Sequence, residues 1–167
     1  MTQSIPRRRF VRELVLALIA VVPVGAASVL GQLATYPNLI PWYASLAKPW
    51  FTPPSWVFGP VWTALYVLMA FALWRVLRAP GYFAGRRFAV VLFGIQLILN
   101  AAWSWMFFGA NSPLLGMVNI IPQLLIILAT VAAFARVDKA AAWCLVPLAV
   151  WVAYASVLNA AIWQANG

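Results

Sequence analysis

The sequence predicts an all-α membrane protein built as a bundle of five transmembrane helices. Of its 167 residues, 66% are hydrophobic and only 8% are charged, whereas a soluble domain is about half apolar and one quarter charged. A helix needs about 20 apolar residues to cross the hydrocarbon core of a bilayer. Five continuous, charge-free runs approach or exceed that length: residues 14–33, 57–74, 88–108, 114–135 and 140–163. Strands of a membrane barrel would be roughly ten residues long and polar on one face.

The first run follows a cluster of arginines at residues 7–12. A basic start followed by an apolar stretch is also typical of a cleaved signal sequence. Residues 14–33 are long for that role, and no small-x-small cleavage site precedes a polar start. We therefore interpret the run as a transmembrane helix, preceded by a mobile basic tail at residues 1–12. Residues 13–167 are expected to form a single transmembrane domain.

The connection between the first two runs, residues 34–56, is long, aromatic and rich in proline. Its prolines fix φ and bias the preceding residues toward extended backbone, which excludes a regular helix. They are Pro37, Pro41, Pro49, Pro53 and Pro54. One interpretation is an aromatic belt at the membrane surface, where Trp and Tyr are favoured. The other is a lid over a binding site, because long ordered loops often carry function.

The other three connections are short, and basic residues lie almost entirely on one side of the bundle. Ten of the eleven Lys and Arg residues fall before the first run or in the connections after the second and fourth runs: Arg7, Arg8, Arg9, Arg12, Arg75, Arg78, Arg86, Arg87, Arg136 and Lys139. In a bacterial inner membrane, this asymmetry places the N-terminus in the cytoplasm, with the C-terminus and residues 34–56 opposite. The net charge of +9 thus indicates membrane orientation rather than nucleic-acid binding.

The residues that the chain lacks exclude several kinds of chemistry. There is no histidine, and Cys144 is the only cysteine. Common transition-metal sites, a histidine-ligated haem and Ser-His-Asp or Cys-His nucleophiles therefore cannot be built. Cys144 is expected to pack as a small apolar side chain. The sequence predicts neither a metal site nor a required cofactor.

Polar and aromatic side chains recur at helical spacing within the apolar runs. Gln96, Asn100 and Trp103 share one face of the third run. An amide in hydrocarbon needs a hydrogen-bonding partner, so this face should point inward, either to join helices or to contact a ligand. Trp62 and Tyr66 are four residues apart in the second run, and Trp151 lies in the fifth. Aromatic stripes of this kind form either core packing or the walls of a ligand pocket.

Three motifs in this order resemble the TspO/MBR family of tryptophan-rich sensory and translocator proteins, which includes the peripheral-type benzodiazepine receptor. Residues 42–69 read WY-x-x-L-x-KP-W-x-x-PP-x-x-VF-x-x-x-W-x-x-LY-x-x-M. Residues 96–109 contain QL-x-LN-x-x-W followed by FFG, and residues 147–159 contain P-x-x-x-W, Ala155 and LN. The resemblance extends over residues 13–164, and the motifs fall on three of the five predicted helices.

The resemblance implies a five-helix bundle, usually dimeric, in which the loop between the first two helices caps a ligand pocket. Family ligands are porphyrins and haem, sterols, and benzodiazepine-type drugs. The expected function is that of an integral membrane receptor or sensor that binds tetrapyrroles. The alternatives are a porphyrin or sterol transporter and a light-dependent porphyrin-degrading enzyme, in which Tyr43, Trp62 and Trp151 would take part in photo-oxidation.

Spacing and resemblance together nominate eleven ligand contacts. They are Tyr43, Lys48, Trp50, Trp62, Tyr66, Gln96, Asn100, Trp103, Phe107, Trp151 and Ala155. Lys48 is the only cation on its side of the membrane, so it could meet either ligand carboxylates or lipid headgroups. Two departures from the family stand out. Leu148 occupies a position where the family commonly has Tyr, and no cation follows Tyr154, which argues against sterol recognition at that motif.

Overall fold

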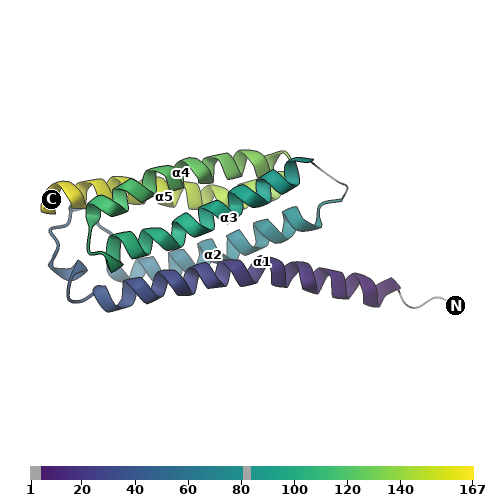
Figure 1. Cartoon of the computed structure of the whole chain (residues 1–167), viewed down its shortest axis with the longest axis horizontal. Coiled ribbons are helices and arrows are strands. Elements are labelled where there is room, and N and C mark those ends of the chain that lie inside the picture. The colour runs from purple at the N-terminus through teal and green to yellow at the C-terminus, as the bar shows by residue number, and fades with distance from the viewer. Residues whose placement is uncertain (1–4, 81–83) are drawn as a thin grey trace.

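The computed structural model describes residues 5–80 and 84–167. Five long helices lie side by side along one axis (Figure 1). They are α1 (Ile5–Thr35), α2 (Ser55–Arg78), α3 (Ala84–Ser104), α4 (Pro113–Ala135) and α5 (Lys139–Asn166). The described residues contain no strand. The predicted fold class, an all-α bundle of five helices, is confirmed.

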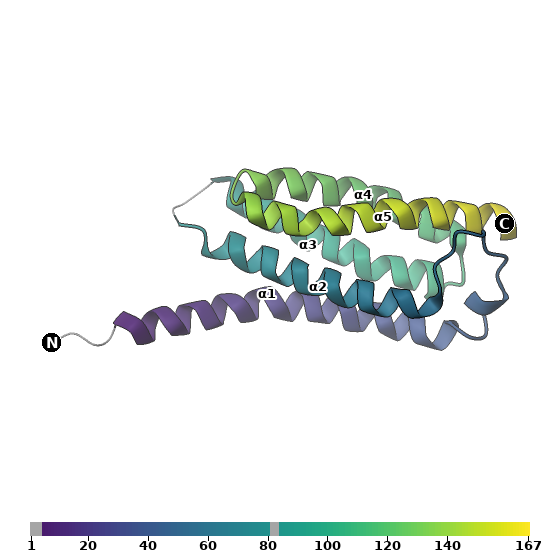
Figure 2. The same cartoon turned by 180° about the vertical axis from the view of Figure 1, so that it is seen from behind.

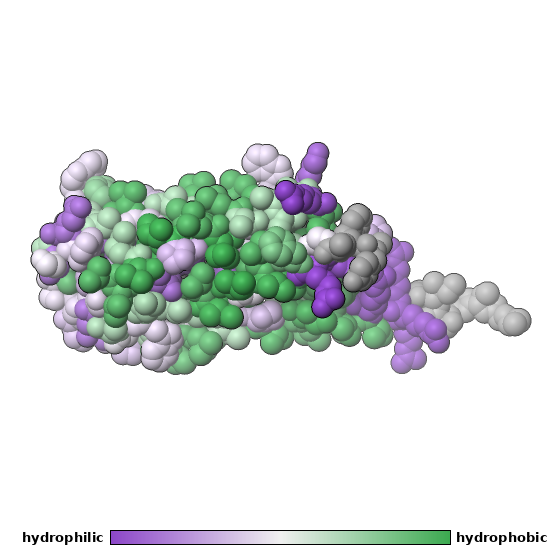
Figure 3. All heavy atoms as spheres, turned by 45° about the horizontal axis from the view of Figure 1, so that its top comes forward, coloured by the Kyte–Doolittle hydropathy of each residue, from purple (hydrophilic) through white to green (hydrophobic). Residues whose placement is uncertain are grey.

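All five helices are long and apolar enough to cross a membrane. In the space-filling view, hydrophobic side chains cover the middle of the molecule and hydrophilic ones gather toward its two ends (Figure 3). Such a surface is stable against lipid, because apolar side chains on the outside of a bundle need no protein partner there. The protein is therefore an integral multi-pass membrane protein.

The first helix is longer than predicted. It begins at Ile5, so residues 5–12, expected to belong to a mobile tail, are helical, while residues 1–4 lie outside the described residues. Thirty-one residues make a helix roughly 46 Å long, well beyond the hydrocarbon thickness of about 30 Å. Figure 2 shows the N-terminal part of α1 projecting past the other helices. The prediction placed the boundary at the start of the apolar run, but arginine is also a good helix former.

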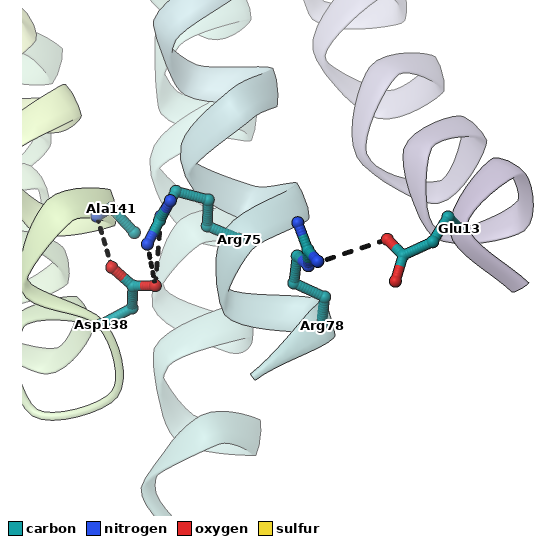
Figure 4. A network of polar contacts seen from close by, with 5 residues as sticks. All are labelled: Glu13, Arg75, Arg78, Asp138 and Ala141. Carbon is teal, nitrogen blue, oxygen red and sulfur yellow. Dashed lines mark hydrogen bonds and ion pairs between the residues drawn. The ribbon is translucent and has the colours of Figure 1, made fainter. Parts of the chain in front are cut away.

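The end of the bundle near the chain's N-terminus, here called the basic end, is closely packed and joined by ion pairs. Phe93 of α3 and Phe134 of α4 stack with ring centroids 5.7 Å apart, and both side chains are buried. In the last turn of α2, Arg75 meets Asp138 at 2.8 Å and Arg78 lies 3.7 Å from Glu13 (Figure 4). The two carboxylates of the sequence thus tie α2 to α5 and to α1.

Residues 36–54, here called the roof, cross the opposite end of the bundle, where the C-terminus lies (Figure 1). As the prolines predict, the roof has no α-helix and contains only two short 3-10 turns, Tyr36–Asn38 and Tyr43–Ser45. The side chain of Asn166, at the end of α5, fixes the roof from outside. Its Oδ1 accepts from the Ala47 amide at 2.9 Å and its Nδ2 donates to the Ala47 carbonyl, also at 2.9 Å.

Candidate functional site

A large cavity of about 990 Å³ lies beneath the roof. Its walls come mainly from α1, α2, α3 and α5, and α4 contributes Ile120 and Gln123. Among the described residues, no side chain that lines the cavity carries a formal charge. A volume at the top of the roughly 300–1,000 Å³ range of small-molecule sites, with mostly apolar walls, is typical of a binding site for a hydrophobic ligand.

One wall of the cavity is an aromatic surface shared by α2 and α5. The rings of Trp62 and Tyr66 are 5.5 Å apart, and Phe58 meets Trp151 edge-on at 5.8 Å. The four-residue spacing of Trp62 and Tyr66 places both on one face of α2. All four side chains line the cavity, so the stripes predicted on these two helices face inward rather than toward lipid.

A second aromatic wall is formed where α3 ends in a turn of π-helix, Trp105–Gly109. Trp103 and Phe107 stack at 4.9 Å, and Tyr43 of the roof packs against Phe107 at 6.2 Å. A π-turn inserts one extra residue per turn, which lets Phe107 and its neighbour Phe108 both be buried. The same ring cluster therefore joins the roof to the cavity wall.

Gly116 of α4 makes this wall possible. A Cβ atom at that position would lie 2.6 Å from Oδ1 of Asn159 and 2.7 Å from Cδ2 of Phe107. Asn159 is held in place because it accepts from the indole of Trp103 at 3.2 Å and donates to the Pro113 carbonyl at 2.8 Å. Phe107 is held by its burial and by its stacking on Trp103. The absence of a side chain at Gly116 thus fixes the position of the aromatic wall.

Polar groups in and around the cavity are few, and several of them are hydrogen-bonded within the protein. The Tyr66 hydroxyl donates to Oδ1 of Asn100 at 2.9 Å. The Tyr154 hydroxyl donates to the Phe51 carbonyl at 2.7 Å, which ties α5 to the roof at a second point. In the roof itself, the pKa of Tyr43 is raised mainly by burial and to a smaller extent by the nearby Tyr154. Tyr43 therefore presents a neutral phenol to the cavity at physiological pH.

Eight of the eleven predicted contacts line the cavity. They are Tyr43, Trp62, Tyr66, Asn100, Trp103, Phe107, Trp151 and Ala155. They come from the roof and from three different helices, so the fold brings together residues that are more than 100 positions apart in sequence.

The other three lie elsewhere. Trp50 is 95% exposed at a turn closed by the Thr52 amide on the Pro49 carbonyl. Lys48 donates to the carbonyls of Ala44 and Leu46, and its ammonium lies 4.7 Å from the centre of the Tyr43 ring. Lys48 therefore contacts Tyr43, which lines the cavity, but does not line the cavity itself.

Gln96 is only 1% exposed but does not line the cavity. It lies one helical turn before Asn100, closer to the packed basic end. Within the described part of the chain, neither its amide nitrogen nor its oxygen has a hydrogen-bonding partner. The structure has the inward direction predicted from its spacing, and it places Gln96 outside the lining of the cavity.

Sequence reasoning did not nominate several cavity residues, above all those of α1. Ser28 and Gln32 line the cavity, and the Gln32 amide donates to the Ser28 hydroxyl at 2.9 Å. Their four-residue spacing in an apolar helix could have predicted that the two side chains share one face and point inward. Phe58 and Asn159 also belong to the site, and both stand inside the quoted motifs. Among the described residues, no group of three His, Cys, Asp or Glu side chains is placed to hold a metal ion.

Comparison with known proteins supports the family resemblance along nearly the whole chain. The model of the TspO/MBR family matches residues 18–164. The tryptophan-rich protein TspO of Chlorobaculum tepidum is 47% identical over 125 residues, which are 75% of this chain and 79% of that protein. The protein of the same name from Archaeoglobus fulgidus is 38% identical over 92% of this chain and 97% of its own length.

An animal protein matches over much of the chain as well. The human translocator protein is 38% identical over 128 residues, covering 75% of each chain. The residues matched by the family model reach from α1 into α5 and include the whole roof. The chain belongs to the TspO/MBR family.

Proposed function

We propose that the protein is a membrane receptor that binds tetrapyrroles, such as porphyrin or haem, in the cavity beneath the roof. The observation that carries the proposal is the cavity itself, which is large, uncharged and walled on two sides by aromatic rings. A flat macrocycle gains most from walls of this kind, because offset and edge-on ring contacts are favourable beyond the area that they bury.

The rings that would contact a macrocycle are held in place before any ligand binds. Trp103 is fixed by its hydrogen bond to Asn159, and Trp151 packs edge-on against Phe58 and contacts Tyr154 at 5.7 Å. Asn100 is likewise oriented by Tyr66. Binding to prearranged side chains costs less conformational entropy than binding that has to order them. The site thus suits a rigid ligand.

In the proposed orientation the N-terminus is cytoplasmic, and the roof lies on the opposite side of a bacterial inner membrane. The basic end carries the arginines of α1 and of the last turn of α2, and cytoplasmic loops are enriched in such residues. A tetrapyrrole would then bind close to the far membrane surface.

Transport of the ligand is a second candidate, favoured by one observation. Val21, Val67 and Phe71 line the cavity and also keep large exposed fractions, which favours a lateral opening of the cavity. Passage through the membrane would require a second opening at the basic end, where Phe93, Phe134 and Leu145 fill the core. Binding therefore remains the conclusion, and ligand flux into proteoliposomes that does not exceed ligand-free leakage would exclude transport.

Tryptophan fluorescence during porphyrin titration tests the binding site. Replacing Trp62 and Trp151 by alanine should weaken binding about tenfold or more, because each ring contact contributes roughly 0.5–1.5 kcal/mol in addition to the apolar area that it buries. The matched control replaces Trp50 and Trp143, which are 95% and 71% exposed and do not line the cavity. Equal affinities in the two double variants would reject the proposed site.

A further inference from the structure

Two stripes of side chains face each other where α1 and α2 lie side by side (Figure 2). On α1 the stripe comprises Ala17, Val21, Gly25, Ser28 and Gln32. On α2 it comprises Ser55, Gly59, Thr63, Val67 and Phe71. Their spacing of three or four residues puts each set on one helix face. Every one of these residues lines the cavity.

Most of the same residues also keep a large exposed fraction. Val21 is 54% exposed, Val67 64% and Phe71 44%, and Gly25, Gln32, Gly59 and Thr63 are exposed too. A side chain that both lines a cavity and lies open on the surface marks a gap in the cavity wall. In a membrane protein this gap faces lipid rather than water.

The space beside two glycines, Gly25 and Gly59, agrees with an open gap. A Cβ atom added at Gly25 or at Gly59 would have no other heavy atom within 4 Å. Gly116, beside the aromatic wall at the end of α3, has no such free space, because a Cβ atom there would overlap Phe107. The chain therefore places its smallest residue on both sides of the gap, at positions where packing does not require it.

The stripes are polar at the roof end and apolar toward the middle of the membrane. α1 and α2 run in opposite directions, so Gln32 and Ser28 lie at the same end as Ser55 and Thr63, while Val67 lies deeper. None of the ten residues is charged. Hydroxyl and amide groups near one membrane surface above an apolar channel match a molecule with a small uncharged head and an apolar tail.

We propose that the gap between α1 and α2 is a lateral portal through which uncharged amphiphiles dissolved in the roof-side leaflet enter the cavity. The head of such a molecule lies among Ser28, Gln32 and Thr63, and its tail passes between Val21 and Val67. The roof remains closed during uptake, because Asn166 and Tyr154 hold it from α5. This inference adds a route of access to the cavity, and it does not depend on the binding of tetrapyrroles there.

The probe is a long-chain alcohol brominated on its tail, since bromine quenches tryptophan fluorescence on contact. It is added to the full chain in phosphatidylcholine liposomes, where partition into lipid gives quenching that rises linearly with concentration. Binding in the cavity adds a saturable component through Trp62, Trp103 and Trp151, which line it. Wild-type protein without saturable quenching would overturn the proposal.

Filling the gap tests the portal. In the double variant Gly25→Leu, Gly59→Leu, the association rate of the probe should fall at least fivefold. The variant should still fold, because leucine forms helix better than glycine and both positions have free space. Gly94→Leu on α3 is the matched control, with equally free space outside the cavity, and it should leave the rate unchanged. A double variant as fast as this control would contradict the portal.

Locking the roof provides the complementary measurement. In a Cys144→Ala background, Ala47→Cys and Asn166→Cys are joined by a short bifunctional maleimide, which replaces the native contacts between these residues. Uptake through the portal predicts the same association rate before and after crosslinking. If crosslinking slows the probe while the leucine variant does not, the route runs through the roof and the proposal is wrong.

The selection for an uncharged head is tested with the brominated fatty acid of the same chain length at pH 8. The carboxylate should give at least tenfold weaker saturable quenching, because no cation lines the cavity, whereas equal quenching would overturn this part of the proposal. The same liposomes also report on the tetrapyrrole site. If the alcohol gives saturable quenching but the porphyrin affinity is the same in the Trp62→Ala, Trp151→Ala double variant, the portal is supported and only the proposed tetrapyrrole site is rejected.

Discussion

The roof and the α1–α2 portal border the same cavity but are held in different ways. The roof is fixed by directional contacts: Asn166 bonds to both backbone groups of Ala47, and the Tyr154 hydroxyl bonds to Phe51. The portal has free space beside both of its glycines, Gly25 and Gly59. Buried polar groups in a loop need hydrogen-bonding partners, whereas apolar side chains that face lipid need no protein partner.

The contrast also explains why α1 packs as it does. The buried residues that α1 contributes to the core are all small: Ala20, Val24, Ala27 and Ala34. They allow α1 to approach α3 closely, and a Cβ atom at Gly31 would lie 3.1 Å from the Ser104 hydroxyl. Ala27 and Gly31 have the small-xxx-small spacing that lets helices approach closely, and in this protein they serve the α1–α3 contact. The side of α1 that faces α2 has no large residue to fill the cavity.

The largest effect on stability is expected from adding a side chain at Gly116, beside the packed aromatic wall. Gly116→Val should lower stability by about 2 kcal/mol, since the added atoms overlap Phe107 and Asn159 and overpacking costs roughly 1–3 kcal/mol. The melting temperature should fall by roughly 4–8 °C. Gly25→Ala, on the portal, should be neutral or slightly stabilising. Equal changes in melting temperature would contradict the difference in packing between the two regions.

A smaller effect is expected from releasing the roof. Asn166→Ala removes the two bonds to Ala47, and each such bond contributes about 1 kcal/mol. Hydrogen exchange at the Ala47 amide should accelerate about tenfold, while amides within α2 are unchanged. Gln164→Ala, an exposed neighbour at the end of α5, is the control. Exchange that is as slow in the Asn166 variant as in this control would mean that the roof is held elsewhere.

The basic end should respond to pH with a still smaller change. Burial alone would raise the pKa of Asp138, but hydrogen bonds from Arg75 and the Ala141 amide, together with the charge of Arg75, lower it below its ordinary value. A carboxyl whose pKa is lowered by folding stabilises the fold when ionised. This contribution is present above about pH 4 and is lost as the pH falls through the folded pKa.

Asp138→Asn should therefore cost about 1 kcal/mol at pH 7, as expected for a partly exposed ion pair, and asparagine can still cap α5. Thermal melts between pH 7 and pH 3 should show the two proteins converging as the pH falls. A difference in melting temperature that stays constant across this range would show that the ion pair is not its cause.

The smallest effect is expected at Lys48. Its ammonium already donates to two roof carbonyls, so Lys48→Gln should change porphyrin affinity by no more than about twofold. The dimethyl ester of the porphyrin, which lacks carboxylates, should bind at least as tightly as the diacid, because the cavity walls are uncharged. If the variant loses about tenfold affinity for the diacid alone, Lys48 reaches the ligand and the roof moves on binding.

The sequence was sufficient to predict the five helices, because each contains a continuous apolar run close to the thickness of the bilayer. Helix ends were less accurate. The prediction started the first helix at residue 14, whereas α1 begins at Ile5, since hydropathy records where lipid begins and not where backbone hydrogen bonding stops. The π-turn at Trp105–Gly109 was also not predicted, because no periodicity distinguishes one extra residue at the end of a helix.

Cavity residues were predictable where they repeat at helical spacing, as Trp62 and Tyr66 do. Gln96 shares that spacing with Asn100 but lies one turn deeper, and sequence does not reveal how far a cavity extends along a helix. The contact of Asn166 with Ala47 joins residues 119 positions apart, so no local pattern indicates it. The portal was missed because its glycines are recognisable only by the free space around them.

A structure of the full chain with a bound metalloporphyrin tests the central claim most directly, because anomalous scattering locates the metal without reference to the protein. The account predicts one peak beneath the roof, with the macrocycle in contact with Trp62 on α2 and Trp151 on α5. A peak beside lipid-facing rings such as Trp143, with the cavity free of porphyrin, would contradict it.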